Sequence, residues 1–148
     1  MGARLLGSVA DGEDAAQETY VRAYRSLVAG KFDGRSRVET WLYRILTNVA
    51  IDMLRARARK PTSAQDQDGF EAVGGERQAV ARVALGELDG WLAALPADQR
   101  VALTLSVVEG MANGDIAEIM ECSEGAVEQR LVRARASLRQ REGVGDHE

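Results

Sequence analysis

The segment between Gly114 and Arg139 constrains the fold most, because its apolar residues lie at helical spacing on both sides of a short polar corner. The first apolar stripe is Ile116, Ala117, Ile119 and Met120, and the second is Val127, Leu131 and Ala134. At the corner, Ser123 can cap the second helix by accepting a hydrogen bond from a backbone N–H near Ala126. Two helices that meet in this way are typical of a helix-turn-helix, and the arginines of the second helix make DNA the first partner to consider. The alternative is an ordinary helical hairpin with a solvated, charged face.

The composition of the 148-residue chain favours an all-α protein of one domain or of two small ones. Alanine, leucine, arginine and glutamate dominate, there are only two prolines, and alternating β-branched residues are scarce. No apolar run approaches the ~20 residues that a membrane-spanning helix needs, and no signal peptide is recognisable. One cysteine and one histidine, His147, give no disulfide framework, no zinc site and no catalytic triad. We therefore expect a cytoplasmic, non-enzymatic protein without a metal or another cofactor.

The charge is unevenly distributed along the chain, although the net charge is only −4. Residues 1–60 contain eleven Lys/Arg and seven Asp/Glu, whereas residues 101–148 contain five and nine. A local basic patch such as the one at the end of the first block can bind nucleic acid despite an acidic pI. The acidic C-terminal block weakens attraction to phosphate, so we expect the helix-turn-helix to act within a larger assembly.

Residues 61–76 divide the chain, because they are polar, contain glycine and lack helical periodicity; we interpret them as a flexible linker. Helical patterning resumes at Arg77 and continues to Leu95, and Pro96 can begin the next helix, which should end at Glu109-Gly110. The sequence therefore predicts a first domain at 1–60, a linker at 61–76, a helix-turn-helix domain at 77–142 and a tail at 143–148.

The first domain is expected to contain two helices, at residues 11–30 and 38–55, around a polar turn at 31–37. One set of residues in the second helix is expected to face a core: Trp41, Leu42, Ile45, Leu46, Val49 and Leu54. Another set is expected elsewhere on its circumference: Tyr43, Arg44, Thr47, Asn48, Asp52 and Arg55. Aromatic side chains among Arg and Asn suit single-stranded DNA, because rings stack on bases, Arg pairs with phosphate and Asn can read a base edge. A plain core role is favoured for Trp41, and a plain surface role for Asn48 stays open.

The first domain and the helix-turn-helix domain, in this order and on either side of such a linker, resemble the bacterial extracytoplasmic-function (ECF) sigma factors, the smallest of the sigma-70 class. The resemblance covers roughly residues 10–60 and 88–140. Its most specific motifs are Glu13-Asp14-Ala-Ala-Gln17-Glu18-Thr-Tyr-Val-Arg22, Phe32-Asp-Gly-Arg-Ser36, Thr40-Trp-Leu-Tyr-Arg44-Ile-Leu-Thr-Asn48, Leu95-Pro96-Ala-Asp-Gln-Arg100 and Ile116-Ala-Glu-Ile-Met-Glu-Cys-Ser-Glu-Gly-Ala-Val127. The resemblance implies two small helical domains: one like sigma region 2, shortened at its N-terminus relative to the family, and one like the region 4 helix-turn-helix.

The resemblance also implies a transcription initiation factor that binds core RNA polymerase and directs it to promoters. The residues implied in binding the β′ clamp helices of the polymerase are Asp14, Gln17, Glu18 and Arg22. The β flap is a second polymerase surface that the resemblance implies as a partner of the chain. Residues implied in reading the −10 element, with Asn48 near a flipped-out base, are Arg37, Trp41, Tyr43, Arg44, Asn48 and Arg55. Residues implied in reading the −35 element in the major groove are Ser123, Glu124, Ala126, Glu128, Gln129, Arg130 and Arg133. An anti-sigma factor is the expected regulatory partner, and no membrane insertion is implied.

Glu128 and Gln129 depart from the family, in which a lysine and a small polar residue are common at these positions. Glutamate repels phosphate but can accept from cytosine N4, and glutamine can pair with adenine, so a different −35 sequence is expected. One alternative is a sigma-like mimic that binds an anti-sigma factor without initiating transcription; another is a dimeric helix-turn-helix repressor. The retained aromatic and Asn readers favour the sigma factor over the mimic, and the repressor leaves the N-terminal motifs unused. For Cys122, a small core residue at the corner is expected rather than a redox sensor.

Overall fold

The computed structural model describes residues 6, 9–59 and 76–145, and within these residues all regular secondary structure is helical. The helices are α2 (Val9–Val28), α3 (Val38–Arg59), α4 (Glu76–Ala93), α5 (Ala97–Val107), α6 (Asn113–Met120) and α7 (Glu124–Gly145). The prediction of an all-α fold is therefore confirmed. Most of the predicted linker 61–76 and the last three residues of the predicted tail lie outside the described residues, so both assignments stay predictions.

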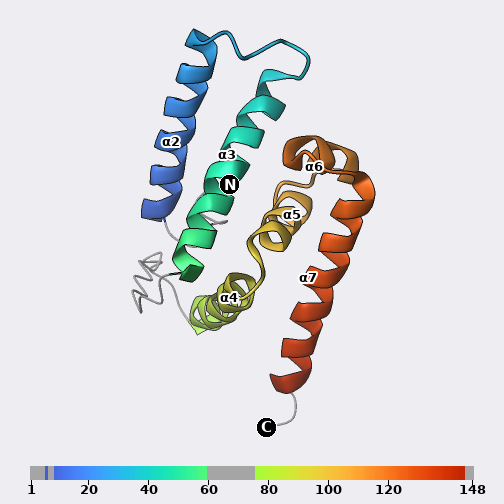
Figure 1. Cartoon of the computed structure of the whole chain (residues 1–148). Coiled ribbons are helices and arrows are strands. Elements are labelled where there is room, and N and C mark those ends of the chain that lie inside the picture. Colours follow the sequence, from blue (N-terminus) through green and yellow to red (C-terminus); the bar gives the residue numbers. More distant parts are fainter. Residues whose placement is uncertain (1–5, 7–8, 60–75, 146–148) are drawn as a thin grey trace.

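Helices α2 and α3 form an antiparallel pair that is joined by residues 29–37 (Figure 1). The buried face of α2 carries small side chains, because Ala15, Thr19 and Ala23 recur at intervals of four residues and are almost fully buried. The Thr19 hydroxyl donates to the carbonyl oxygen of Ala15 at 2.7 Å, so this polar group is satisfied where it is buried. Small residues on this face let α2 approach α3 closely.

Helices α5, α6 and α7 pack around one another, and α4 lies against α7 (Figure 1). Their shared core consists of residues that are at most 4% exposed: Val101, Leu105, Ile116, Ile119, Val127, Leu131 and Ala134. Full burial of each large apolar side chain contributes roughly 1.5–3 kcal/mol. The two apolar stripes that the sequence predicts for the hairpin therefore meet in this core.

The corner between α6 and α7 is formed by residues 121–123. Glu121 ends α6 in the left-handed conformation, with φ 54° and ψ 47°, and the backbone N–H of Cys122 donates to the carbonyl oxygen of Ala117 at 3.1 Å. The Ser123 hydroxyl accepts a hydrogen bond from the backbone N–H of Ala126 at 3.1 Å, which confirms the predicted helix cap. Cys122 is half-buried and packs against the core, as expected for a small core residue.

Helix α3 is covered on two sides, by α2 on one and by α5 and α6 on the other (Figure 1). Val49 is buried, and Ile45, Leu46 and Leu54 pack against the core cluster, as the sequence predicts. This cluster continues from α3 into α5, α6 and α7, so the two halves of the chain share one apolar core.

Two predictions for α3 are wrong because they assumed a single buried face. Thr47 and Tyr43 were expected away from the core, but Thr47 is 1% exposed and Tyr43 packs against the core cluster. Conversely, Trp41 and Leu42 were expected in the core but are only half-buried and lie outside the cluster. The Trp41 ring instead packs on the ring of Phe32, with centroids 4.8 Å apart and an interplanar angle of 43°.

Candidate nucleic-acid interface

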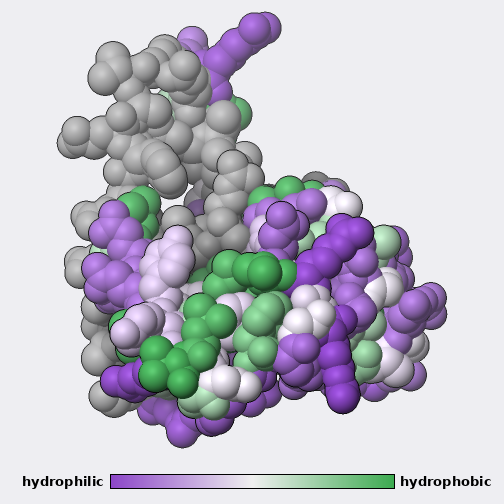
Figure 2. Space-filling view, turned by 90° about the horizontal axis from the view of Figure 1, so that it is seen from above, coloured by the Kyte–Doolittle hydropathy of each residue, from purple (hydrophilic) through white to green (hydrophobic). Residues whose placement is uncertain are grey.

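The outer face of α2 combines charged and apolar side chains. Asp14, Gln17 and Glu18 are exposed, and Arg22 Nε donates to Glu18 Oε1 at 3.0 Å. Arg22 also lies 3.8 Å from a carboxylate oxygen of Asp52 on α3. Large apolar and aromatic residues are exposed on the same helix, among them Tyr20, Val21, Tyr24, Leu27 and Val28. Figure 2 looks onto the end of the molecule where α2 ends and α3 begins, and apolar residues gather there beside hydrophilic ones; such patches mark interaction surfaces.

The six residues predicted to read the −10 element fall into three groups. Arg37, Asn48 and Arg55 are exposed to solvent, with Asn48 in the middle of α3. Trp41 is half-buried beside Phe32, at the start of the same helix. The remaining two residues, Tyr43 and Arg44, are half-buried and bonded to the C-terminal half of the chain. The structure therefore brings these six residues to one helix and the turn before it, but not to one open surface.

Tyr43 reaches the segment between α5 and α6, and Arg44 reaches α6. The Tyr43 hydroxyl donates to Glu109 Oε2 at 3.4 Å, and burial followed by the nearby Glu109 carboxylate raises the pKa of Tyr43 above its usual value. Arg44 Nε donates to the carbonyl oxygen of Glu118 at 2.8 Å and lies 4.0 Å from Glu121 Oε1. Both side chains are thus held by groups that no local sequence pattern places near them.

The residues predicted to read the −35 element lie on the first turns of α7. Five of them are exposed, namely Ser123, Glu124, Glu128, Gln129 and Arg133, whereas Ala126 and Arg130 are half-buried. The exposed carboxylates and amide at the start of a helix can enter a major groove, where the N-terminal residues of a recognition helix contact base edges. Their contact with DNA stays a prediction.

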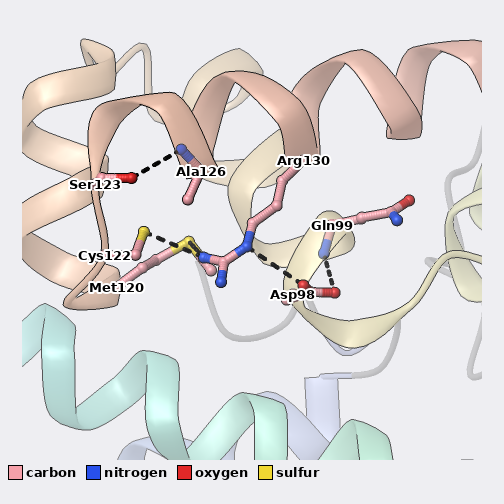
Figure 3. A network of polar contacts seen from close by, with 7 residues as sticks. All are labelled: Asp98, Gln99, Met120, Cys122, Ser123, Ala126 and Arg130. Carbon is pink, nitrogen blue, oxygen red and sulfur yellow. Dashed lines mark hydrogen bonds and ion pairs between the residues drawn. The ribbon is translucent and has the colours of Figure 1, made fainter.

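Arg130 differs from its neighbours because its guanidinium is bonded within the protein (Figure 3). Its Nε lies 3.3 Å from Asp98 Oδ2, and one terminal nitrogen lies 3.3 Å from Cys122 Sγ and 3.8 Å from Met120 Sδ. Asp98 also accepts from the backbone N–H of Gln99 at 2.9 Å, which orients its carboxylate. Only 27% of the Arg130 side chain is exposed. The side chain therefore fixes α7 to the start of α5 and to the corner.

The sequence did not indicate which residues hold Tyr43, Arg44 and Arg130 in place. Asp98 was identified only as part of the motif Leu95–Arg100, and Glu109 only as the end of a helix. Their partners lie 32 and 66 positions away in the sequence, and no periodic pattern reports contacts at that separation. Glu118, whose carbonyl oxygen accepts from Arg44, was likewise read as part of a motif alone.

The described residues offer little for other chemistry. No group of His, Cys, Asp or Glu among them is placed to hold a metal ion, and no helix among them is long and apolar enough to cross a membrane.

Comparison with known families decides the class. The family model "Sigma-70 region 2" matches residues 2–60, and "Sigma-70, region 4" matches residues 85–138. The chain belongs to the sigma-70 family. Within this family it is 36% identical to the RNA polymerase sigma-H factor of Pseudomonas aeruginosa over 146 residues, covering 91% of this chain and 75% of the relative. It is also 36% identical to the ECF RNA polymerase sigma-E factor of Escherichia coli K12 over 140 residues, covering 86% of this chain and 72% of the relative.

Solved structures agree with this assignment to the ECF group. CnrH in complex with the cytosolic domain of CnrY is similar with a TM-score of 0.66 and 28% identity, over 97% of this sigma factor and 79% of that chain. The sigma factor RpoE of Bartonella quintana, solved with the anti-sigma factor NepR, is similar with a TM-score of 0.63 and 28% identity, over 94% and 85%. The predicted family is confirmed, and this sigma factor is a promoter-directed transcription initiation factor.

Proposed function

We propose that this sigma factor divides its work among three surfaces: the outer face of α2 binds core polymerase, α3 reads the −10 element, and the start of α7 reads the −35 element. The observation that carries this proposal is that regions 2 and 4 match separate parts of one chain, with the predicted residues on α2, α3 and α7. Such work breaks no covalent bond, so the protein is not an enzyme and needs no cofactor. It acts in the cytoplasm, where polymerase and chromosome meet.

Polymerase binding is assigned to four polar residues of α2, namely Asp14, Gln17, Glu18 and Arg22, with the neighbouring apolar residues as the buried centre of the contact. Charged groups at the rim of an interface steer association and fix its register, whereas buried apolar groups supply most of the affinity. The exposed Tyr20 and Tyr24, at 69% and 70% exposure, are well suited to such a centre. The partners proposed are the β′ clamp helices for α2 and the β flap for the C-terminal half.

Promoter reading at −10 is assigned to Asn48 with the basic residues around it. A flipped-out base costs a few kcal/mol of stacking and pairing, so a side chain that recognises the base also selects the promoter. Asn48 presents both a donor and an acceptor to solvent, and Arg37 and Arg55 on the same segment can contact phosphates.

Promoter reading at −35 is assigned to Glu128 and Gln129, with Arg133 as a phosphate contact. Glu can accept from cytosine N4 and Gln can pair with adenine, so a C/A-containing step is the expected target. Ser123 serves this surface indirectly, because its hydroxyl caps α7.

A regulatory partner is proposed from the similar Bartonella quintana sigma factor, which was solved with the anti-sigma factor NepR. We propose that an anti-sigma factor also binds this chain.

The test is reconstituted transcription with the full chain, bacterial core polymerase and a library of promoter fragments. Specific transcripts that require the chain establish the function and give both promoter sequences. Substitution of Gln129→Ala should then change the selected −35 sequence but not the −10 sequence. Polymerase binding without any transcript would contradict the proposal and favour a mimic that only binds an anti-sigma factor.

A further inference from the structure

The side chain of Glu124 lies against α6, although the residue belongs to the first turn of α7. A Cβ atom placed on Gly114 would lie 3.1 Å from Glu124 Oε1 and 3.8 Å from Glu124 Cδ. Among the described residues, only Glu124 comes this close to that position, apart from α6 itself. Glu124 and Gly114 also line one open pocket of about 500 Å³, together with Ala117 and Cys122. The carboxylate therefore reaches back to the start of α6 from the far side of the corner.

The first turn of α6 is a favourable place for a carboxylate. Ala112, the residue before α6, makes no side-chain hydrogen bond that caps the helix, because its side chain is a methyl group. The backbone N–H groups of residues 113–115 have no acceptor within the helix, and the helix dipole places partial positive charge at this end. Gly114 has no Cβ atom, so the Glu124 carboxylate can approach this backbone closely.

The start of α7, which we assign to −35 reading, is thereby held on two sides. Arg130 fixes α7 to Asp98 of α5 at 3.3 Å, and Glu124 connects the first turn of α7 to the first turn of α6. Glu128 and Gln129 follow about one turn later on α7 and are exposed. Hydrogen bonds to base edges tolerate only small changes in distance and angle. A change in the angle between α6 and α7 would therefore move these two side chains away from their bases.

We propose that Glu124 is a positioning residue for −35 recognition: its carboxylate holds the first turn of α7 against the first turn of α6 and so sets the angle at which Glu128 and Gln129 meet the bases. The inference rests on the proposed function, because the angle between these helices affects promoter choice only if α7 reads the −35 element. Glu124 then acts through Glu128 and Gln129 and touches no base itself.

A double-mutant cycle tests the contact between Glu124 and Gly114. The methyl group that Gly114→Ala adds would press on the carboxylate, so Glu124→Ala should cost less stability in this background than in the wild type. We expect the shift in the urea midpoint that Glu124→Ala causes to fall to about half. The matched control is Gly90→Ala in α4, where an added Cβ meets nothing within 4 Å. In that background Glu124→Ala should cost as much as in the wild type. Equal cost in all three backgrounds overturns the contact.

Promoter selection tests the positioning role. The full chain is bound to bacterial core polymerase and offered promoter fragments with one fixed −10 sequence and a randomised −35 region, and the bound fragments are sequenced. Glu124→Ala should relax the preference about threefold, a part of the discrimination that one bidentate contact supplies, at the same base pairs as Gln129→Ala. When the two substitutions are combined, Glu124→Ala should add nothing at those base pairs. Gly114→Ala should cause a smaller change at the same base pairs.

Three other results would overturn the inference. A change of preference at a different base pair would show that Glu124 contacts a base directly. A destabilised Glu124→Ala protein with an unchanged −35 preference would show that the residue is purely structural. If the wild-type chain with polymerase selects no −35 sequence at all, −35 reading by α7 fails, and the positioning role fails with it. A cycle that still shows the contact between Glu124 and Gly114 identifies this last outcome as a failure of the proposed function.

Discussion

Asn48 is the residue whose role in promoter reading can be separated most cleanly from folding, because its side chain is exposed in the middle of α3. Substitution of Asn48→Ala should change the free energy of unfolding by less than about 0.5 kcal/mol, as is usual at exposed positions. Open-complex formation should weaken and selectivity at −10 should relax, without weaker binding to polymerase. Transcription from promoter variants, measured beside polymerase affinity, checks this. Equal activity of mutant and wild type on all variants would refute the assignment.

Arg130 has two possible roles, and a double-mutant cycle with Asp98 separates them. The ion pair at 3.3 Å is partly buried, with 27% and 36% of the two side chains exposed. If the pair positions α7, Arg130→Met and Asp98→Asn should each destabilise the protein by about 1 kcal/mol, and the double variant should cost less than their sum. Urea denaturation measures all three variants.

Binding of −35 duplex DNA distinguishes the two roles of Arg130. A positioning role predicts similar losses of affinity for Arg130→Met and Asp98→Asn, because both loosen α7. A direct phosphate contact predicts a larger loss for Arg130→Met and a smaller dependence of its affinity on salt. The matched control is Arg133→Met, since Arg133 is exposed on the same helix.

At the scale of elements, α7 depends on its first turn. The Ser123 hydroxyl accepts from the Ala126 N–H at 3.1 Å, and removal of such a cap costs about 1 kcal/mol. Ser123→Ala should therefore lower the free energy of unfolding by about that amount, and Ser123→Asp should retain most of it, because a carboxylate also caps and favours the helix dipole. Urea denaturation of the three proteins checks the order. Equal stability of wild type and Ser123→Ala would contradict the cap.

The elements were predictable from the sequence because their signals are local. The apolar stripes, the cap at Ser123 and the break at Pro96 each depend on residues within a few positions of one another, and the structure places helices on all of them. Thr47 and Tyr43 were misplaced because periodicity reveals one buried face but not a second one made by a distant helix. The same limit hid the partners of Arg44 and Arg130, which are set by tertiary packing alone.

For the whole molecule, the contact between the halves contributes to stability. An apolar core continues from α3 into α5, α6 and α7 and stabilises the fold, whereas the Thr47 hydroxyl and the Nε of Arg100, which are buried without a hydrogen-bond partner among the described residues, oppose folding.

Thr47→Val should stabilise the fold, because it removes one of these unsatisfied groups. Thr47 lies one helical turn from Tyr43, on the covered side of α3, and its hydroxyl is buried without a partner among the described residues. Valine has nearly the same size and removes the unsatisfied group, so the free energy of unfolding should rise by about 1 kcal/mol.

The matched control for this substitution is Thr19→Val, because the Thr19 hydroxyl is also buried but donates to the Ala15 carbonyl oxygen at 2.7 Å. Loss of this hydrogen bond should lower the free energy of unfolding. Urea denaturation should show opposite signs for the two variants. A Thr47→Val protein that is less stable than the wild type would contradict this assignment, because it would show that the Thr47 hydroxyl makes a favourable interaction.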